Sequence, residues 1–355
     1  MKKILAILCI LGTIFYAFAA RAAENQLLSP EWWTTATPEM VKDQIKLGAA
    51  TNAKNEDGWT PLMFAAQFSL HPEIIDILAV NDINGRDNEG WTALMHAAIF
   101  NSLAEVTETL IKKGADVNAK NETGMTALME AAQFNSNAHI IDILLEAGAE
   151  IDAKNKKGAT ALMYAAGFNS INAVEHLTGV KMVIEKIREG AMVAKLVKSD
   201  IIADVNARDN EGMTPLMYAA ASLNDTTEII MRLVIMGADV NAQTISGQTA
   251  LMIAAQKNKH QDVISKLTNY SGCERFIIKD SKGKTAIDYA NENPYIRNTD
   301  AYKNLMIWKN VPNYFLIELP SGKSLTSITI WLDGGLFSKA SFSTSSALLP
   351  CSFLS

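Results

Sequence analysis

The 355-residue sequence has few of the residues from which catalytic and metal sites are built. It contains three cysteines, Cys9, Cys273 and Cys351, which are too few and too widely spaced for a disulfide scaffold or a zinc cluster. Its five histidines form no pair at metal-ligand spacing, and it has no glycine-rich phosphate loop and no Gly-x-Ser-x-Gly motif. We therefore expect no catalytic residues, no cofactor, no metal ion and no small-molecule substrate, and predict that the chain is not an enzyme.

Basic residues are also fewer than acidic residues. The 32 Lys and Arg residues are outnumbered by 38 Asp and Glu residues, which gives a formal net charge of −6. Nucleic-acid-binding domains are usually basic, so we expect no nucleic-acid partner. The hydrophobic fraction of 48% argues against intrinsic disorder, and the charged fraction of 20% argues against a multi-pass membrane protein.

The first residues have the layout of a secretory signal peptide. Two lysines precede an uncharged apolar run of 17 residues (4–20), and Ala20-Arg21-Ala22 supplies a small-x-small cleavage site. We expect cleavage after Ala22, or alternatively after Ala19, and a mature protein that is periplasmic or secreted. A run of this length approaches the roughly 20 residues of a membrane span, so a retained N-terminal anchor is the alternative.

One nine-residue pattern recurs through the middle of the chain. Gly58-Trp-Thr-Pro-Leu-Met-Phe-Ala-Ala66 returns as Gly90-Trp-Thr-Ala-Leu-Met-His-Ala-Ala98, and further copies begin at Gly124, Gly158, Gly212, Gly247 and Gly283. Successive glycines are 32, 34, 34, 54, 35 and 36 residues apart. A period near 33 with a Thr-Pro-Leu core resembles the ankyrin repeat, and the resemblance covers roughly residues 38–307.

The residues of each copy predict its local structure. Asp87-Asn-Glu-Gly90 has the preferences of a type I turn, Thr60 is suited to cap a helix, and Pro61 is suited to its first position. A second apolar helix follows, as at 140–145, and Gly148 ends it. We predict an all-α fold, an ankyrin-repeat solenoid of turn–helix–helix units that bury their apolar faces against one another.

Methionine is abundant, and its distribution fits this fold. Six of the 15 methionines occupy one repeated position in the first helix, where we expect them to fill space between stacked units: Met63, Met95, Met129, Met163, Met217 and Met252.

The predicted organisation has four parts. They are a signal peptide (1–22), an N-terminal linker or cap (23–37), the repeat array (38–307) and an atypical tail (308–355). Within the array, repeats begin near residues 55, 87, 121, 155, 209, 244 and 280.

The step of 54 residues contains an insertion at about 179–200. The spacing of Val180, Ile184, Ile187 and Ala191 predicts a helical segment packed on the array. The alternative is a basic amphipathic segment that binds an acidic partner or a membrane surface.

In the tail, two short apolar runs suggest a weak hairpin. Residues 314–319 and 324–332 would be its strands, joined by a Pro-Ser-Gly-Lys turn. A two-stranded ribbon alone is marginally stable, so we expect a weakly structured tail.

The family resemblance implies protein binding through the turn tips and the concave face of the first helices. The variable positions there follow the turn glycine or the Leu-Met pair, and aromatic and Met residues are enriched in interface cores. The candidate protein-binding residues are Trp59, Trp91, Met125, Met213, Phe64, Glu130, Tyr164 and Tyr218. For the two tryptophans, packing between repeats is the alternative.

Two further columns recur along the array. The first column comprises Phe68, Phe100, Phe134 and Phe168, for which we favour packing between neighbours over a binding stripe. The second column is basic and comprises Lys54, Arg86, Lys120, Lys154, Arg208 and Lys279. Acidic residues nearby in the sequence predict that it forms a solvated mixed surface.

These observations predict a monomeric scaffold that binds an unknown partner protein in the periplasm or outside the cell. The alternatives are a membrane-tethered scaffold with an uncleaved anchor, and an enzyme whose activity lies in the insertion or the tail.

Overall fold

The computed structural model describes residues 26–80, 82–168, 170–186, 192–198, 202–270, 278–309, 328–332 and 335–340. The predicted signal peptide, the three cysteines and residues 314–319 lie outside these ranges. The chain divides into two compact units, Met1–Asn210 and Glu211–Ser355. Among the described helices, none is both long and apolar enough to cross a membrane.

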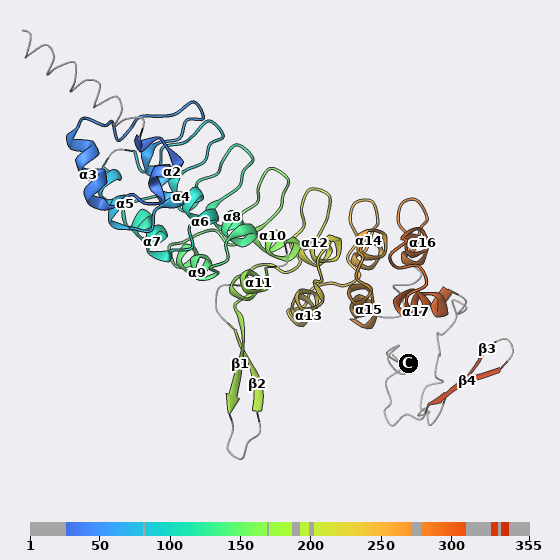
Figure 1. The fold of residues 1–355 in the computed structure, drawn as a ribbon. Coiled ribbons are helices and arrows are strands. Elements are labelled where there is room, and N and C mark those ends of the chain that lie inside the picture. The colour runs from blue at the N-terminus through green and yellow to red at the C-terminus, as the bar shows by residue number, and fades with distance from the viewer. Residues whose placement is uncertain are drawn as a thin grey trace, which may run out of the picture. The chain divides into compact units, whose positions relative to one another are not determined.

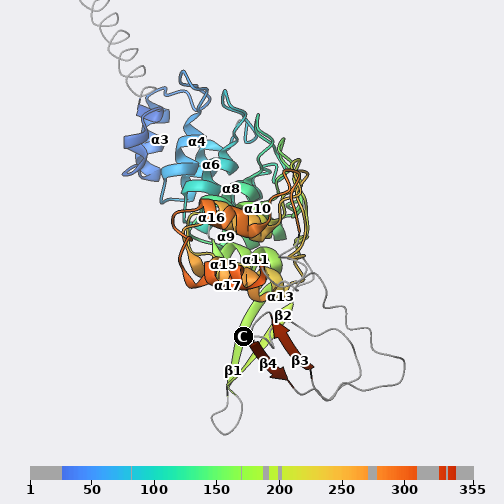
Figure 2. The ribbon, with the colours of Figure 1, turned by 90° about the vertical axis from the view of Figure 1, so that its right-hand side faces the viewer.

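In the first unit, helices form two rows. The first row contains α2 (Pro30–Trp33), α4 (Pro61–Phe68), α6 (Ala93–Phe100), α8 (Ala127–Phe134) and α10 (Ala161–Gly167). The second row contains α3 (Pro38–Lys46), α5 (Glu73–Leu78), α7 (Ala104–Lys112), α9 (His139–Glu146) and α11 (Ile171–Thr178). Each helix packs against the next in its own row (Figures 1 and 2). The predicted turn–helix–helix units are therefore present.

The second unit repeats this plan. Its first row contains α12 (Pro215–Ala221), α14 (Ala250–Lys257) and α16 (Ala286–Glu292). Its second row contains α13 (Thr227–Ile235), α15 (Gln261–Tyr270) and α17 (Asp300–Lys309). Neighbours within each row are again in contact.

The ends of the helices follow from the sequence. The Thr60 hydroxyl accepts a hydrogen bond from the Met63 amide at 3.4 Å, and Pro61 occupies the first turn of α4. The same threonine cap begins α3, α6, α8 and α14. Gly148 follows α9 with φ of 89°, a left-handed conformation that glycine adopts without a steric cost.

The core between the rows consists mainly of alanine, leucine and isoleucine, together with methionine. The six repeated methionines are each at most 1% exposed, as their predicted space-filling role requires. The paired alanines of the first helices are also buried. Their small side chains allow adjacent helices to approach closely.

A complete capping repeat precedes the repeats that are recognisable in the sequence. Its second helix is α3, which packs against α5, and α2 packs against α4 and so takes the place of a first helix. Trp33 is 1% exposed, and its indole Nε1 donates to the Leu27 carbonyl at 3.0 Å. This tryptophan therefore packs inside the cap.

Buried asparagines connect consecutive repeats. The Asn101 Nδ2 after α6 donates to the Ala66 and Ser69 carbonyls at the end of α4, at 3.0 and 2.9 Å. Asn135 makes the same pair of bonds to Ala98 and Asn101. In the second unit, Asn258 and Asn293 repeat this arrangement on α12 and α14. Each asparagine satisfies carbonyls that the preceding helix leaves open.

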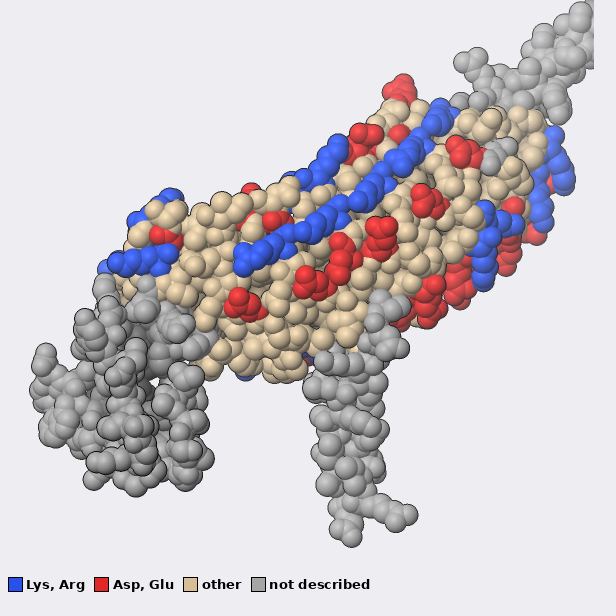
Figure 3. Space-filling view, turned by 180° about the vertical axis from the view of Figure 1, so that it is seen from behind, with Lys and Arg blue, Asp and Glu red and all other residues tan. Residues whose placement is uncertain are grey.

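The basic column forms a second connection within the first unit, which we call the basic ladder. Each side chain donates to the backbone carbonyl of the next basic residue: Lys54 to Arg86 (2.8 Å), Arg86 to Lys120 (2.6 Å), Lys120 to Lys154 (3.0 Å) and Lys154 to Arg208 (2.7 Å). All five residues are exposed. Lys and Arg side chains form a band on this face of the molecule (Figure 3).

The insertion is a hairpin, so the predicted helical segment is wrong. Strand β1 (Val180–Lys186) pairs antiparallel with β2 (Met192–Lys198), and Ile184 lies opposite Ala194. The four-residue step from Val180 to Ile184 fits the period of a helix, but it also fits the two-residue period of a strand. Both segments are rich in β-branched residues, which favour strands. Ile187 and Ala191 lie outside the described residues.

The tail also contains a hairpin, whose two described strands are β3 (Ile328–Leu332) and β4 (Gly335–Ala340). Strand β3 falls within the expected second strand. Its partner is β4, which follows it in the sequence, and residues 314–319 lie outside the described residues. A short connection brings neighbouring strands together at a smaller entropic cost than a longer one.

Candidate functional site

The turns of the first unit are fixed by one side chain each. Asn55, Asp87, Asn121 and Asn155 stand at the start of successive turns, and in each the Oδ1 accepts the amides two and four residues later, at 2.8–3.0 Å. The second of these amides belongs to the residue after the turn glycine. The backbone of Trp59, Trp91 and Met125 is therefore held in place by its own turn.

Hydrogen bonds also join neighbouring turns. The Asn88 amide donates to the Asp57 carbonyl at 3.0 Å, and the Glu122 amide donates to the Glu89 carbonyl at 2.9 Å. Lys156 donates to Thr123 in the same way. The turns thus form a continuous row at one edge of the first unit.

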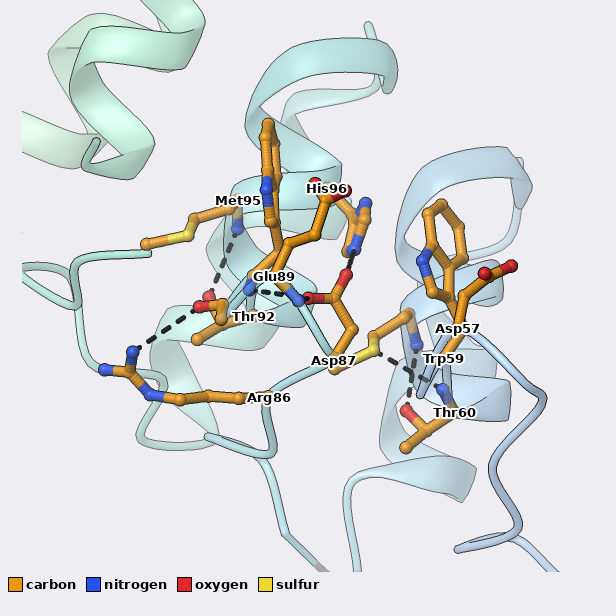
Figure 4. A network of polar contacts seen from close by, with 12 residues as sticks. Asp57, Trp59, Thr60, Arg86, Asp87, Glu89, Thr92, Met95 and His96 are labelled. Atoms are coloured by element: carbon orange, nitrogen blue, oxygen red, sulfur yellow. Dashed lines mark hydrogen bonds and ion pairs between the residues drawn. The ribbon is translucent and has the colours of Figure 1, made fainter. Parts of the chain in front are cut away.

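His96 lies between the tryptophans of two successive turns. Its ring centroid is 4.0 Å from that of Trp59 and 5.4 Å from that of Trp91. Its Nε2 lies 3.2 Å from the Asp87 Oδ2, and both side chains are 4% exposed (Figure 4). Trp59 also contacts the Phe64 ring, with the centroids 4.9 Å apart. Aromatic packing therefore restricts the orientation of both indoles.

Hydrogen bonds from the turn and from the imidazole set the ionisation of Asp87. Burial alone would raise the pKa of its carboxyl. The hydrogen bonds from His96 and from the Trp91 and Glu89 amides outweigh burial, so the pKa lies below its usual value. Asp87 is therefore a carboxylate at neutral pH.

The next-but-one repeat makes the equivalent contact with neutral groups. The Asn155 Nδ2 donates to the Tyr164 hydroxyl at 2.7 Å and lies 3.3 Å from the Met125 sulfur of the preceding repeat. The turn residue and the first-helix residue are nine positions apart here, as they are in the Asp87–His96 pair. Burial, with a contribution from the charge of Glu130, raises the pKa of the Tyr164 hydroxyl.

Glu130 breaks this pattern. It occupies the same position on α8 as His96 on α6, but its side chain is 3% exposed and makes no hydrogen bond or ion pair with any described residue. Burial raises the pKa of its carboxyl to about 7. The proton of Glu130 is therefore held to a much higher pH than that of an exposed glutamate.

The comparisons with known proteins give a family. The model for ankyrin repeats matches in three copies, at residues 34–121, 104–186 and 219–311. The chain belongs to the ankyrin-repeat family. A comparison with curated proteins gives no significant match. Ankyrin repeats generally mediate protein–protein interactions and are typically non-catalytic scaffolds, which agrees with the fold described above.

The predicted binding residues differ in how much surface they present on the ankyrin repeats. Phe64 and Glu130 are 3% exposed and Met125 is 7% exposed, so their side chains contribute mainly to packing. The other five are half-buried: Trp59, Trp91, Tyr164, Met213 and Tyr218. The structure brings Trp59, Trp91 and Phe64 together around His96. Met213 and Tyr218 belong to the second unit.

The phenylalanine column combines the two alternatives that the sequence left open. Phe134 and Phe168 pack edge to face with centroids 5.5 Å apart, which is contact between neighbouring ankyrin repeats. Both rings nevertheless remain exposed, by 55% and 50%, and Phe100 is 61% exposed. These side chains add apolar surface at the ends of α6 and α8 and just beyond α10.

Sequence reasoning missed the residues that hold the ankyrin turns against the first helices. Asp87 and Asn155 each contact the side chain nine positions later, and the signal was present in the sequence as Asp with His and Asn with Tyr at that spacing. Among the described residues, no three His, Cys, Asp or Glu side chains are grouped so that they could hold a metal ion.

Proposed function

We propose that this ankyrin-repeat chain is a scaffold that binds a partner protein through the turn tips and first helices of its first unit. It acts without catalysis and without a cofactor, in the periplasm or outside the cell. The partner contacts the row of turns around Trp59 and Trp91.

The arrangement of the two tryptophans around His96 carries this proposal. Both indoles are half-buried, so each keeps surface available for a partner while the other side is packed against the imidazole. A large aromatic side chain whose orientation is already restricted loses little conformational entropy on binding. Tryptophan is also among the residues that most often dominate interface energies.

The proposed location rests on the N-terminal pattern of two lysines, an apolar run and Ala20-Arg21-Ala22. A scaffold that retains this segment would instead be tethered to a membrane. The intact mass of the chain recovered from the envelope or the medium distinguishes the two forms, because cleavage after Ala22 removes 22 residues.

The binding site is tested with the double variant Trp59→Ala plus Trp91→Ala. The tagged wild-type and variant chains are used to capture partners from the native envelope and medium, and each captured protein is then titrated against both chains. We expect at least a tenfold loss of affinity, because the variant removes two central aromatic contacts.

The matched control is Leu70→Ala plus Leu223→Ala, which removes two exposed apolar side chains outside the turn row. It should leave binding unchanged. If the tryptophan variant instead binds normally, or loses binding only because its unfolding midpoint collapses, the tryptophans are structural and the proposed site is wrong.

A further inference from the structure

The basic ladder differs from several other basic residues of the described chain in how its charges are balanced. Six basic residues outside the ladder each form an ion pair with a carboxylate: Lys46, Lys112, Lys113, Arg232, Lys284 and Lys303. In the described part of the chain, four ladder residues have no carboxylate oxygen within 4.0 Å: Lys54, Arg86, Lys120 and Lys154. Acidic residues nevertheless lie near them in the sequence. The predicted mixed surface therefore lacks the expected neutralisation along this line.

Backbone carbonyls hold these cations in place without neutralising them. The first four ladder side chains each donate a hydrogen bond to a carbonyl of the next repeat. A lysine ammonium has three donors, so Lys54, Lys120 and Lys154 each keep two for another ligand. The side chains have also lost part of their rotamer freedom, which lowers the entropic cost of a further contact.

The spacing of the charges restricts the shape of a matching ligand. One cation occurs in each repeat, and adjacent packed helices are separated by about 8–10 Å. A polyproline II helix has three residues per turn and rises about 9 Å in each turn, so every third side chain returns to the same face. A β-strand would place successive third residues on opposite faces.

We propose that the basic ladder from Lys54 to Arg208 binds an extended acidic polypeptide segment that carries Asp or Glu at every third position. The segment lies along the band of Figure 3 with one carboxylate opposite each repeat. This surface uses different residues from the Trp59–Trp91 site, so it is a second contact and its failure does not affect the first.

The test uses the full chain and a fluorescent peptide in which Glu-Pro-Pro is repeated four times. Its binding is followed by fluorescence anisotropy at low salt and at about 0.15 M salt, where surface charges are screened over about 8 Å. The comparison peptide has the same composition with its four glutamates clustered. We expect the evenly spaced peptide to bind more tightly and to weaken as salt rises.

The ladder is altered with Lys120→Gln plus Lys154→Gln. Glutamine removes the charge but keeps an amide donor, and Gln243, at the corresponding position of another repeat, donates to the Gly247 carbonyl of its own turn. We expect at least a tenfold loss of peptide affinity with an unchanged unfolding midpoint. The control, Lys42→Gln plus Lys156→Gln, removes two exposed charges outside the ladder and should retain most of the affinity.

Three results would overturn the proposal. They are no salt-dependent binding by the wild-type chain, an equal loss in the control pair, and equal affinity for the clustered peptide. Binding to vesicles that contain phosphatidylglycerol without binding to the peptide would assign the ladder to a membrane surface instead. The Trp59→Ala plus Trp91→Ala variant should bind the peptide normally, which separates this test from that of the proposed function.

Discussion

The Nε2 of His96 lies 3.2 Å from the Oδ2 of Asp87, and this contact joins the start of a turn to the first helix of its own repeat. The other carboxylate oxygen of Asp87 accepts two amides of the turn at 2.8 and 3.0 Å. One side chain therefore fixes both the shape of the turn and its position on α6. The indoles of Trp59 and Trp91 pack around the imidazole that it holds.

The first prediction concerns Asp87. Asp87→Ala leaves two turn amides and the His96 ring without their acceptor, and we expect a loss of about 2–3 kcal/mol in unfolding free energy. Asp87→Asn keeps an oxygen for the amides, as Asn55 and Asn121 do in neighbouring repeats, and should cost about 1 kcal/mol or less. Urea unfolding of the full chain measures both, and equal losses would contradict the dual role.

The second prediction is a pH dependence set by Glu130. Burial raises the pKa of its carboxyl from 4.5 to about 7, so the folded chain binds this proton more tightly than the unfolded chain. The favourable effect is complete below about pH 4.5 and is lost as the pH rises through about 7. Since each pKa unit corresponds to about 1.4 kcal/mol, the charged carboxylate costs on the order of 3 kcal/mol.

Glu130→Gln removes this cost, so the variant should be more stable than the wild-type chain at pH 8 and nearly equal at pH 5. Unfolding midpoints across this range measure the difference. Glu122→Gln is the matched control, because Glu122 is an exposed carboxylate in the same repeat and its substitution should not change the pH profile. A Glu130→Gln chain that is less stable at pH 8 would show that the carboxylate has a favourable partner.

The third prediction compares two glycines in left-handed conformations. Gly114 has φ of 91° and open space where a Cβ would stand, so Gly114→Ala should cost about 1–2 kcal/mol from backbone strain. Gly124 has φ of 83°, and a Cβ there would lie 2.8 Å from the Lys156 amide and 3.1 Å from the Asn155 Cα.

Gly124→Ala should therefore cost at least about 1–3 kcal/mol more than Gly114→Ala, because the added methyl group pushes two turns apart. The hydrogen bond from the Lys156 amide to the Thr123 carbonyl lies at this contact and should lose its protection from amide exchange. Equal losses in the two variants would mean that the turns separate without resistance.

Much of the fold could be predicted because its signals are local and repeated. Thr60 and Pro61 marked the start of a helix, and Gly148 marked the end of another. The hairpin of β1 and β2 could not be separated from a helix, because Val180 and Ile184 satisfy both periods. The short α2 carries no copy of the repeat motif, so only its packing against α4 reveals its role.

The candidate site was less predictable than the fold. The sequence identified the column that contains Phe64 and Glu130, but exposure depends on the neighbouring repeat, and both side chains are buried. The half-buried state of Trp59 and Trp91 likewise depends on His96, which reaches both of them. A column of basic residues was visible, whereas the carbonyls that hold its side chains belong to the next repeat.

The buried asparagine that completes the carbonyl end of a first-row helix lies in the following sequence repeat, so a structural unit does not coincide with a sequence repeat. Asn135 donates to the carbonyls at the end of α6, which belongs to the preceding repeat. Removing a segment between two turn glycines therefore also removes the asparagine that bonds to the helix before that segment. A break placed just after Asn101 keeps its bonds to the end of α4, but it leaves the carbonyl end of α6 without Asn135. A shortened array should therefore always expose the carbonyls of its last first-row helix unless the new end supplies a closing amide.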